Sequence, residues 1–380
     1  MIVRTRGALL EAMGAAAPYA ESQPLRVADL DLAAPGPGEV LVEVAYAGLC
    51  HSDLSVVDGA RPRAMPMVLG HEASGVVRET GLGVDVVAAG DHVVFSYVPM
   101  CGRCVPCLSG RGSLCERGAA ANAAGALLGG GRRFSGCGHE AIHHHLGVSA
   151  FSRLTVVAQE SLVAIDADVP LDVAALFGCA VLTGVGAVVN TARMPAGASA
   201  AVFGLGGVGL SSVLGARAAG AQPLVAVDVL ADKLELATRL GATHVVNAAD
   251  VDPVEAVREI TRGGAAYAFE SVGSERVLAQ AYEATARGGT TVTVGLPEPS
   301  RMLSIPAVSL VAEERTVKGS YMGSAVPRRD IPAYIGLYRQ GRLPVDLLHT
   351  ATIRLDDINV AFDELAAGRA VRQLVDLSLD

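Results

Sequence analysis

Apolar and polar residues follow two different rhythms along the chain. From about residue 198, short apolar runs alternate with amphipathic stretches of helical period. Apolar runs of this kind predict strands, and the stretches between them predict helices. The predicted strands are 198–204, 224–229, 244–247, 267–273 and 290–295, and the predicted helices are 208–220, 231–241, 253–264 and 274–289. Strands separated by helices of this length predict a parallel sheet with helices on both faces.

The part before residue 180 has a shorter period. Runs such as EVLVEVAYAG at 39–48 alternate along a strand and are interrupted by Gly and Pro, which favours a β-rich domain. After residue 322 come two helical patterns, at 330–341 and 355–368, and a strand pattern at 372–379. The stretch 118–133 is the only low-complexity segment and predicts a flexible loop. We therefore expect an α/β protein with domains at 1–180 and 181–322, and a segment 323–380 that returns to the first domain.

Composition narrows the class of protein. The chain has 380 residues, 51% of them hydrophobic, enough to fill two cores. The formal net charge of −9 argues against nucleic acid or an anionic membrane as a partner. The N-terminus carries no signal-type apolar run, and no run approaches the ~20 apolar residues of a membrane span. We expect a cytoplasmic protein, in which clustered cysteines bind metal rather than form disulfides.

A glycine motif lies at the start of the alternating region. Gly204, Gly206 and Gly209, in the run GLGGVG, follow a predicted buried strand and open a helix. Asp228 ends the next strand, 19 residues after Gly209. In a Rossmann unit the glycines let the backbone approach a diphosphate at the helix N-terminus, and the acid accepts from the adenosine ribose hydroxyls. An acid at this position repels a 2′-phosphate, so the motif predicts NAD(H) rather than NADP(H).

Four of the seven cysteines lie within the fifteen residues 101–115. Cys101, Cys104, Cys107 and Cys115 have a spacing suited to a closed tetrahedral zinc site. An iron–sulfur cluster is the alternative metal, but no Pro follows Cys115 and no second cluster run is present. A closed site has no position left for substrate, so this cluster predicts a structural ion.

A second set of donors is scattered over the chain. Cys50 begins C-H-S-D, His71 lies in G-H-E, and Cys179 lies in F-G-C. Two thiolates and one imidazole leave one coordination position open, as a catalytic zinc requires. Cys137 is assigned no role.

Together these motifs resemble those of the zinc-dependent alcohol dehydrogenases of the medium-chain dehydrogenase/reductase superfamily, nearly from end to end. The resemblance implies a GroES-like catalytic domain, an inserted Rossmann domain, and an active site in the cleft between them. It implies that Cys50, His71 and Cys179 bind the catalytic zinc, and that Asp53 orients His71. Glu72 matches the family's nearby acid, and Ser52 matches the hydroxyl that bonds the alcohol.

The resemblance also assigns cofactor and substrate contacts. Lys233 assists Asp228 at the ribose, while His51 and Arg372 face the diphosphate. Further cofactor contacts fall at Thr183, Gly207, Val208, Val272 and Leu296. Tyr97, Ala120, His145 and Leu296 map to the substrate pocket. Of the histidines at 143–145, we expect at most one to line that pocket.

One position departs from the family pattern. Where the liver-type enzymes end their proton relay in a His, this chain has Ser55. Ser55 has no ionisable base, which leaves the outer relay open, with water or His51 as the exit.

The predicted reaction is the reversible oxidation of an alcohol, primary in our interpretation, to an aldehyde or ketone. Hydride passes from an alcohol held at the catalytic zinc to NAD, with two zinc ions per chain. The alternative is a mycothiol- or glutathione-dependent formaldehyde dehydrogenase. The loop 58–63, DGARPR, lacks the acids of the glutathione-linked branch, which weakens that reading. A non-catalytic NAD-binding protein on the same fold is less favoured, because all three zinc ligands are kept. By analogy we expect a homodimer.

Overall fold

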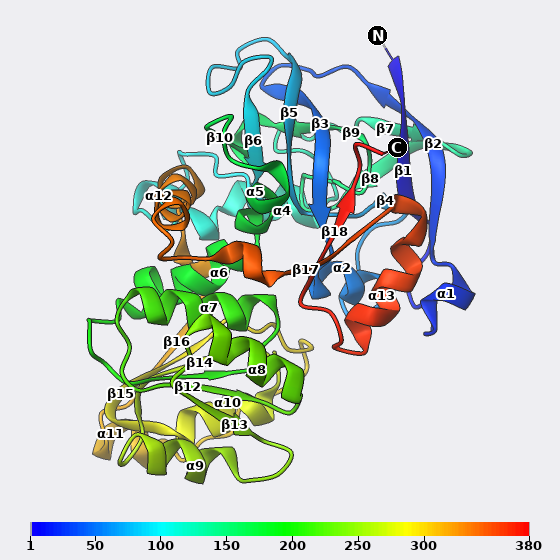
Figure 1. The fold of residues 1–380 in the computed structure, drawn as a ribbon. Helices are drawn as coiled ribbons and strands as arrows, with labels where there is room; N and C mark the ends of the chain where they lie inside the picture. Colours follow the sequence, from blue (N-terminus) through cyan, green and yellow to red (C-terminus); the bar gives the residue numbers. More distant parts are fainter. Residues whose placement is uncertain (1, 380) are drawn as a thin grey trace. The chain divides into compact units, whose positions relative to one another are not determined.

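A computed structural model describes residues 2–379 (Figure 1). The chain divides into two compact units, each described here by itself. The first runs up to Cys179 and includes Val326–Pro332 and the chain from His349 onward. The second comprises Ala180–Ala325 and Ala333–Leu348. The sequence had placed all of 323–380 in the first domain. Ala333–Leu348 belongs to the second because its residues pack there: Arg342 donates to the Ala218 carbonyl at 3.4 Å.

The first unit contains a closed barrel and a seven-stranded sheet. The barrel strands, in spatial order, are β1 (Ile2–Leu10), β2 (Leu25–Ala33), β7 (Phe134–Gly136), β8 (His139–His144) and β4 (Met67–Val68). The sheet runs β10 (Leu162–Ile165), β6 (His92–Phe95), β5 (Glu72–Thr80), β3 (Glu39–Gly48), β18 (Arg372–Asp376) and β17 (His349–Ile353), and β9 (Leu154–Ala158) also pairs with β3. The C-terminal strand pattern thus returns to the first unit as β18, antiparallel to β3.

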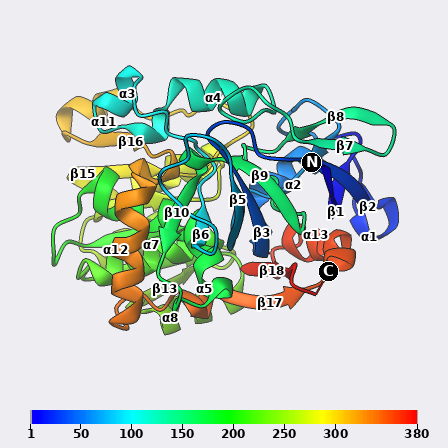
Figure 2. The same ribbon diagram turned by 90° about the horizontal axis from the view of Figure 1, so that it is seen from above.

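Strand β3 is the centre of this unit. Val40, Val42 and Val44 belong to the larger buried cluster, while Leu41 belongs to the cluster that fills the barrel. Buried side chains therefore cover both faces of β3. Figures 1 and 2 show β3 and β5 side by side, in agreement with their antiparallel pairing.

The helices of the first unit are short. They are α1 (Tyr19–Ser22), α2 (His51–Val57), α3 (Val105–Leu108), α4 (Glu116–Ala123), α5 (Leu171–Ala175) and α13 (Ile358–Ala366), with single turns η1 (Gly112–Leu114), η2 (Gln159–Ser161), η3 (Leu176–Gly178) and η7 (Leu355–Asp357). Helix α12 (Pro327–Arg339) spans the division between the units. Asp363 on α13 accepts from the backbone N–H groups of Tyr19 and Ala20, which attaches α1 to α13.

The prediction of a flexible loop at 118–133 is partly wrong, because the first part of this stretch lies in α4. The thiol of Cys115 caps this helix by accepting from the Gly118 N–H at 3.3 Å. Alanine has the strongest helix propensity, so an Ala-rich segment becomes helical once its first turn is capped. Asn122 then donates to the Tyr97 carbonyl at 2.8 Å, which attaches the helix to the chain before the four-cysteine loop.

The second unit contains a six-stranded parallel sheet in the order β13 (His244–Asn247), β12 (Leu224–Asp228), β11 (Ala200–Phe203), β14 (Ala265–Glu270), β15 (Thr285–Thr293) and β16 (Thr316–Gly319). This is the order of a Rossmann sheet, with the switch point beside the first strand, β11. Its helices are α6 (Ala180–Gly186), the π-helix η4 (Ala187–Ala192), α7 (Gly207–Ala218), α8 (Ala231–Leu240), α9 (Pro253–Ile260), α10 (Glu275–Glu283) and α11 (Ala307–Ala312), with η5 (Met322–Ser324) and η6 (Val345–Leu348). Helices occupy both faces of the sheet (Figure 1).

One predicted helix is too long. The sequence predicted a helix over 274–289, but α10 ends at Glu283 and β15 begins at Thr285. The Thr285 hydroxyl donates to the Ala281 carbonyl, the last turn of α10, and also contacts the Thr291 hydroxyl at 2.8 Å. Gly288 has a positive φ of 71°, which a helix does not accommodate. The chain therefore pairs with β14 as a strand before the helical sequence pattern ends.

Among residues 2–379, no single helix is long and apolar enough to cross a bilayer. The bent pair Leu171–Gly178 and Ala180–Ala192 meets the length and composition test only when its two parts are taken together.

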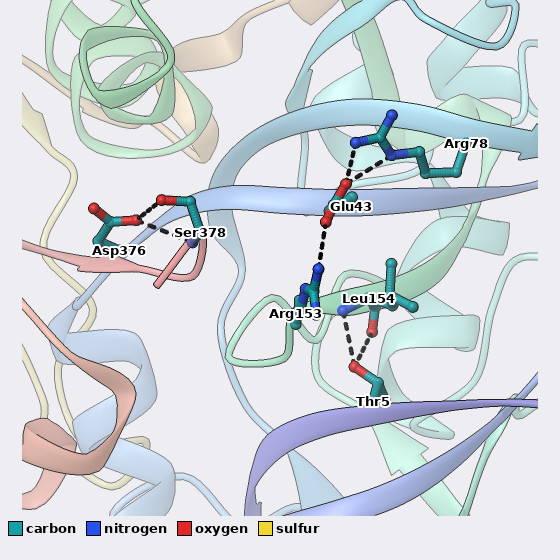
Figure 3. Close-up of polar contacts among 7 residues, drawn as sticks. All are labelled: Thr5, Glu43, Arg78, Arg153, Leu154, Asp376 and Ser378. Carbon is teal, nitrogen blue, oxygen red and sulfur yellow. Dashed lines mark hydrogen bonds and ion pairs between the residues drawn. The ribbon is translucent and has the colours of Figure 1, made fainter. Parts of the chain in front are cut away.

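Charged side chains join the strands around β3 (Figure 3). Glu43 on β3 accepts from Arg78 on β5 and from Arg153 beside β9. The Thr5 hydroxyl of β1 accepts from the Leu154 N–H at 2.9 Å, which connects the barrel to β9. Asp376, at the end of β18, accepts from the Ser378 hydroxyl at 2.6 Å. Glu43 and Thr5 thus add side-chain contacts between strands that are distant in the chain.

His144 is a buried histidine at the end of β8. Its Nε2 atom accepts from the Arg133 N–H at 3.1 Å, and its ring packs on Phe134 with centroids 5.1 Å apart. Burial, reinforced by the charges of Arg133 and Arg132, lowers the pKa of His144 to about 3. The folded protein therefore keeps this ring neutral at a pH where the unfolded chain, with a pKa of about 6.5, binds a proton.

We predict that this difference costs stability in mild acid. Because the unfolded state binds the extra proton, the free energy of unfolding falls below pH ~6.5, by about 2 kcal/mol between pH 7 and pH 5 from this residue alone. His144→Gln keeps an acceptor for Arg133 without the titration. Denaturant unfolding at both pH values should show a smaller acid-dependent loss in the variant. An equal loss in both proteins would contradict the assignment.

Candidate active site

Strand pairing brings Cys50 and His71 together. Cys50 follows β3 and precedes α2, and His71 immediately precedes β5. Gly48, near Cys50, is paired with Glu72, next to His71. Because the two strands are antiparallel, the loops that carry the two side chains leave the same end of the sheet. The register of β3 against β5 therefore fixes the positions of two of the three predicted ligands, Cys50 and His71.

Cys179 arrives from a distant segment. It follows α5 and the single turn η3, and Gly178 lies against β6: a Cβ atom there would stand 2.7 Å from the Phe95 carbonyl oxygen. Only glycine permits that approach. The ligand atoms of Cys50, His71 and Cys179 all lie within 4.8 Å of one another, and all three residues are buried. The structure thus brings together the scattered donors that the sequence singled out.

Asp53 orients His71. The Nδ1 atom of His71 lies 3.2 Å from Oδ1 of Asp53, and the same oxygen accepts from the Gly70 N–H at 3.0 Å. Burial opposes charge on His71, but the Asp53 carboxylate raises its pKa well above the usual range. With Nδ1 turned to Asp53, Nε2 is the nitrogen left to bind a metal.

The two thiols share their protons unequally. The contact with Cys179 lowers the pKa of Cys50 well below its usual range, and the charge of Arg372 and contact with His71 act in the same direction. The contact with Cys50, together with burial, raises the pKa of Cys179. Cys50 therefore loses its proton readily, whereas Cys179 loses its proton only when another positive charge lies nearby. A divalent cation supplies that charge.

Glu72 and Arg372 lie behind the three donors. Burial raises the pKa of Glu72 to about 7, although Arg372 opposes the shift. The Arg372 Nε atom is 3.6 Å from Glu72 Oε1, and its Nη1 donates to the Leu49 carbonyl at 3.1 Å. Neither Glu72 oxygen forms a hydrogen bond with another described group. Glu72 is thus a buried acid beside the donor cluster. The role of Arg372 at a diphosphate stays a prediction.

The donor set fits zinc. Two sulfurs and one imidazole nitrogen are borderline-soft ligands, and three protein ligands leave a fourth position for a reactant. The partly orphaned carboxylate of Glu72 is consistent with a positive charge in this space.

The predicted pocket residues differ in their surroundings. Tyr97 is buried, and its ring stands edge-on to His71 with centroids 5.5 Å apart. His145 is buried and also lies edge-on to His71, with centroids 5.4 Å apart. Ala120 is exposed on α4. Leu296, in the second unit, is 51% exposed. Tyr97 and His145 thus lie beside the donor cluster. The pocket role of all four residues stays a prediction.

The three consecutive histidines have three different environments. His143 is half-buried, and its Nδ1 accepts from Arg132 Nε at 3.0 Å. His144 lies in the barrel core, and only His145 lies beside the metal-binding donors. Alternation along β8 separates the side chains of His143 and His144, and His145 follows the end of the strand.

Ser55, at the position where the liver-type enzymes end their proton relay, has its hydroxyl bonded within its own helix. Ser55 donates to the Ser52 carbonyl at 3.0 Å, so its proton is held within α2. Ser52 is partly buried and His51 is exposed, both on the first turn of this helix. Ser55 therefore does not extend a relay outward by donating a proton.

The four-cysteine loop forms a cluster of its own. The sulfurs of Cys101, Cys104, Cys107 and Cys115 all lie within 4.8 Å of one another. A backbone N–H at Cys107 lowers the pKa of Cys104 to about 7, while burial raises the pKa of Cys107 to about 12. The N–H groups of Cys101 and Gly118 point to the Cys115 sulfur at 3.4 and 3.3 Å. Donors aimed at a sulfur stabilise its ionised form, as a metal thiolate requires.

The glycine motif of the second unit forms a strand-to-helix turn. Gly204 ends the strand β11 with φ +87°, and α7 begins at Gly207, with Val208 in its first turn. A Cβ atom at Gly209 would stand 1.8 Å from the Gly204 carbonyl oxygen, so only glycine lets helix and strand pack. A Cβ at Gly206 would meet nothing within 4 Å. The open space at Gly206 fits a diphosphate brought close to the backbone.

Asp228 is fixed at the end of β12. One carboxylate oxygen accepts from the Leu205 N–H at 2.7 Å, and the other from the N–H groups of Val229 and Leu230. The acid is therefore held beside the glycine turn. Thr183 is buried, and its hydroxyl has no hydrogen-bond partner among the described residues, a group that a ligand would satisfy. Lys233 is half-buried on α8, and Val272 is exposed. These residues fit a dinucleotide, and their individual contacts with it stay predictions.

The sequence did not reveal two features of the site. One is the contact of His145 with Asp53, at 3.0 Å between Nδ1 and Oδ1. The other is the close approach of Gly178 to β6. Both join segments far apart in the chain, and no local pattern marks them.

Comparison with known proteins covers nearly the whole chain. Residues 36–167 match the model of the alcohol dehydrogenase GroES-like domain, and residues 207–340 match that of the zinc-binding dehydrogenases. An S-(hydroxymethyl)glutathione dehydrogenase of Paracoccus denitrificans is 39% identical over 93% of this chain and 96% of that protein. A putative alcohol dehydrogenase D of Mycobacterium tuberculosis is 40% identical over 95% of this chain and 98% of its own length.

Solved structures agree with these relatives. An alcohol dehydrogenase zinc-binding domain protein from Burkholderia ambifaria has a TM-score of 0.93 and 37% identity, over 99% of both chains. A benzyl alcohol dehydrogenase of Acinetobacter calcoaceticus has a TM-score of 0.91 and 33% identity, over 98% of this chain and 99% of that one. With the donor clusters and the Rossmann sheet, these likenesses show that the chain belongs to the zinc-dependent alcohol dehydrogenases of the medium-chain dehydrogenase/reductase superfamily.

Proposed function

We propose that this chain catalyses the reversible, NAD-dependent oxidation of a primary alcohol to its aldehyde. The observation that supports this most strongly is the buried cluster of Cys50, His71 and Cys179, which offers three ligands and leaves one coordination position. When bound, zinc supplies a Lewis acid and the dinucleotide a hydride acceptor.

The chain's own residues prepare this chemistry. Asp53 turns Nδ1 of His71 away from the metal-binding position and fixes the ring. Ser52, two residues after Cys50, is the hydroxyl that takes the alcohol's proton. Because Ser55 donates inward to the Ser52 carbonyl, the proton leaves toward solvent or His51. The burial of the three ligands keeps water away from them, which strengthens their electrostatic interactions.

Asp228 supports NAD(H) as the cofactor. Its carboxylate is held beside the glycine turn by three backbone N–H groups. A fixed negative charge there accepts from ribose hydroxyls and repels a 2′-phosphate.

A second function has support in the relatives' names. The protein from Paracoccus denitrificans is named an S-(hydroxymethyl)glutathione dehydrogenase, and this chain is 39% identical to it. The loop 58–63 weighs against glutathione here, because it carries Arg61 and Arg63 and only one acid, Asp58. A thiol adduct of formaldehyde other than that of glutathione is compatible with this basic loop.

We also propose that the protein is a homodimer that functions in the cytoplasm. Among the described residues, β16 pairs with β15 alone, so one edge of the sheet offers free backbone groups. Shortly before this edge strand in the chain, Val308 and Val311 on α11 are largely exposed. A second copy related by a two-fold axis would pair β16 with its own equivalent and cover these side chains.

One prediction concerns the reaction. NAD⁺ reduction should be observed with primary aliphatic, benzylic or terpenoid alcohols, and Cys50→Ser should abolish it because the metal loses one of three ligands. NAD⁺ binding, measured by calorimetry, should survive the substitution. Secondary alcohols, and formaldehyde with and without glutathione or mycothiol, complete the screen. Full activity in Cys50→Ser would refute the assignment, and turnover confined to formaldehyde plus a thiol would favour the second function.

The next prediction separates the two metal clusters. Cys104→Ser should lower the thermal unfolding midpoint and reduce zinc from two ions per chain to one, because a closed site loses one of its four ligands. Substrate preference should not change in the protein that remains folded. Cys137→Ser, outside both clusters, is the matched control and should keep two zinc ions. A change of substrate preference in Cys104→Ser, with stability intact, would contradict the structural role.

Another prediction concerns assembly. Val311→Glu places a charge on the apolar surface of α11 and should shift the sedimentation coefficient from dimer to monomer. Leu82→Glu is a matched control, because Leu82 is as exposed as Val311, 84% against 83%, but lies in the first unit. A wild-type monomer, or an intact dimer in Val311→Glu, would refute the interface.

A further inference from the structure

The buried carboxylate of Asp53 contacts two histidines. Its Oδ1 atom lies 3.2 Å from Nδ1 of His71 and 3.0 Å from Nδ1 of His145. Asp53, His71 and His145 are each at most 1% exposed. The two rings are nearly perpendicular, at 89°. One carboxylate thus lies between the metal-ligand candidate His71 and a second imidazole.

The backbone holds His145 in this position. Its N–H donates to the Ser149 hydroxyl at 2.8 Å, and that hydroxyl donates to the Val68 carbonyl at 2.7 Å. Further along, the Ala150 N–H donates to the Gly70 carbonyl at 3.1 Å. The segment that carries His145 is therefore attached to the segment that leads into His71. This arrangement sets the distance between the two imidazoles independently of their side-chain contacts.

A buried carboxylate needs donors around it. Gly70 supplies one N–H to Asp53, and His71 supplies a second. The Nδ1 atom of His145 has no hydrogen-bond partner of regular geometry among the described residues, and Asp53 Oδ1, 3.0 Å away, is the acceptor within its reach. Without His145, the carboxylate would lose the imidazole nitrogen that lies 3.0 Å from its Oδ1 atom. A buried acceptor that loses its donor is costly and is free to reorient.

We propose that His145 is a positioning residue for the catalytic metal site: its imidazole holds the Asp53 carboxylate in the orientation in which Asp53 fixes His71. The inference rests on the proposed function, since it takes Cys50, His71 and Cys179 as metal ligands. His145 acts on the metal only through Asp53 and His71. Partners behind a metal-binding histidine commonly change metal affinity by 10- to 100-fold.

A direct metal site is the competing reading of the same residues. Ligand atoms of Asp53, His71 and His145 also lie within 4.8 Å of one another. The Gly70 N–H already donates to the Asp53 oxygen that faces both rings. A cation there would also take the His71 nitrogen that faces Asp53. These contacts favour hydrogen bonding, and a count of bound zinc separates the two readings.

The experiment uses the zinc-loaded full chain and two substitutions at one position. His145→Phe keeps a ring of similar size without a donor, and His145→Asn keeps a donor near the position of Nδ1. Zinc release is followed against a graded chelator, with Cys50→Ser marking the release step of the catalytic site. Cobalt exchanged into that site adds a visible spectrum that reports its geometry. His143→Asn is the matched control, because His143 contacts Arg132 rather than Asp53.

We expect His145→Phe to weaken zinc retention at the catalytic site about 10-fold and to alter the cobalt spectrum. We expect His145→Asn to stay within about threefold of wild type on the same scale. In His145→Phe, kcat should fall together with zinc retention, whereas a purely structural role would shift the unfolding midpoint alone.

Three results would overturn the inference. They are unchanged zinc retention in His145→Phe, equal weakening in both variants, and a wild-type count of three zinc ions that falls to two without His145. A wild type that holds no zinc at Cys50, His71 and Cys179, or that oxidises no alcohol, would refute the proposed function instead.

Discussion

The first unit depends on the convergence of Cys50, His71 and Cys179, whose ligand atoms lie within 4.8 Å of one another. No local conformation places these residues together, so the fold must. The pairing of β3 with β5 fixes the loops that carry Cys50 and His71. The approach of Gly178 to β6 fixes Cys179. Remote from the site, Glu43 also contacts Arg78 and Arg153 on neighbouring segments (Figure 3).

The site is also a concentration of buried charge. Asp53, Glu72 and Arg372 are almost fully buried within or behind the donor cluster. Charges removed from water are tolerated only when they are paired or bonded. Asp53 is bonded to Gly70 and His71, and Arg372 lies 3.6 Å from Glu72. The buried charges and the metal ligands therefore change one another's pKa values. The four-cysteine loop differs, because its ligands come from a single segment and need little of the remaining fold.

Part of the fold and of the candidate site could be predicted from the sequence, for physical reasons. The Rossmann sheet could be predicted because apolar strand runs alternate with stretches of helical period, and each of these elements buries its apolar residues. The four-cysteine loop follows from spacing, and β3 from the alternation of its residues along 39–48. The helix α4 was missed because its cap is a cysteine thiol and its Ala-rich sequence has no amphipathic face. The early start of β15 was missed because pairing with β14 overrides a helical pattern. The contact between Asp53 and His145 joins a helix to a loop far along the chain, and nothing local signals it.

The central claim is that the chain holds two zinc ions in two different ligand sets. Zinc K-edge X-ray absorption of the purified protein, with zinc quantified per chain, tests it most directly. Four sulfurs at one ion, with two sulfurs, one nitrogen and one further light ligand at the other, give an average of about three sulfurs near 2.3 Å and one nitrogen or oxygen near 2.0–2.1 Å. That average, at two zinc ions per chain, is the predicted result. A shell of sulfur alone, or a single zinc ion per chain, would contradict the account.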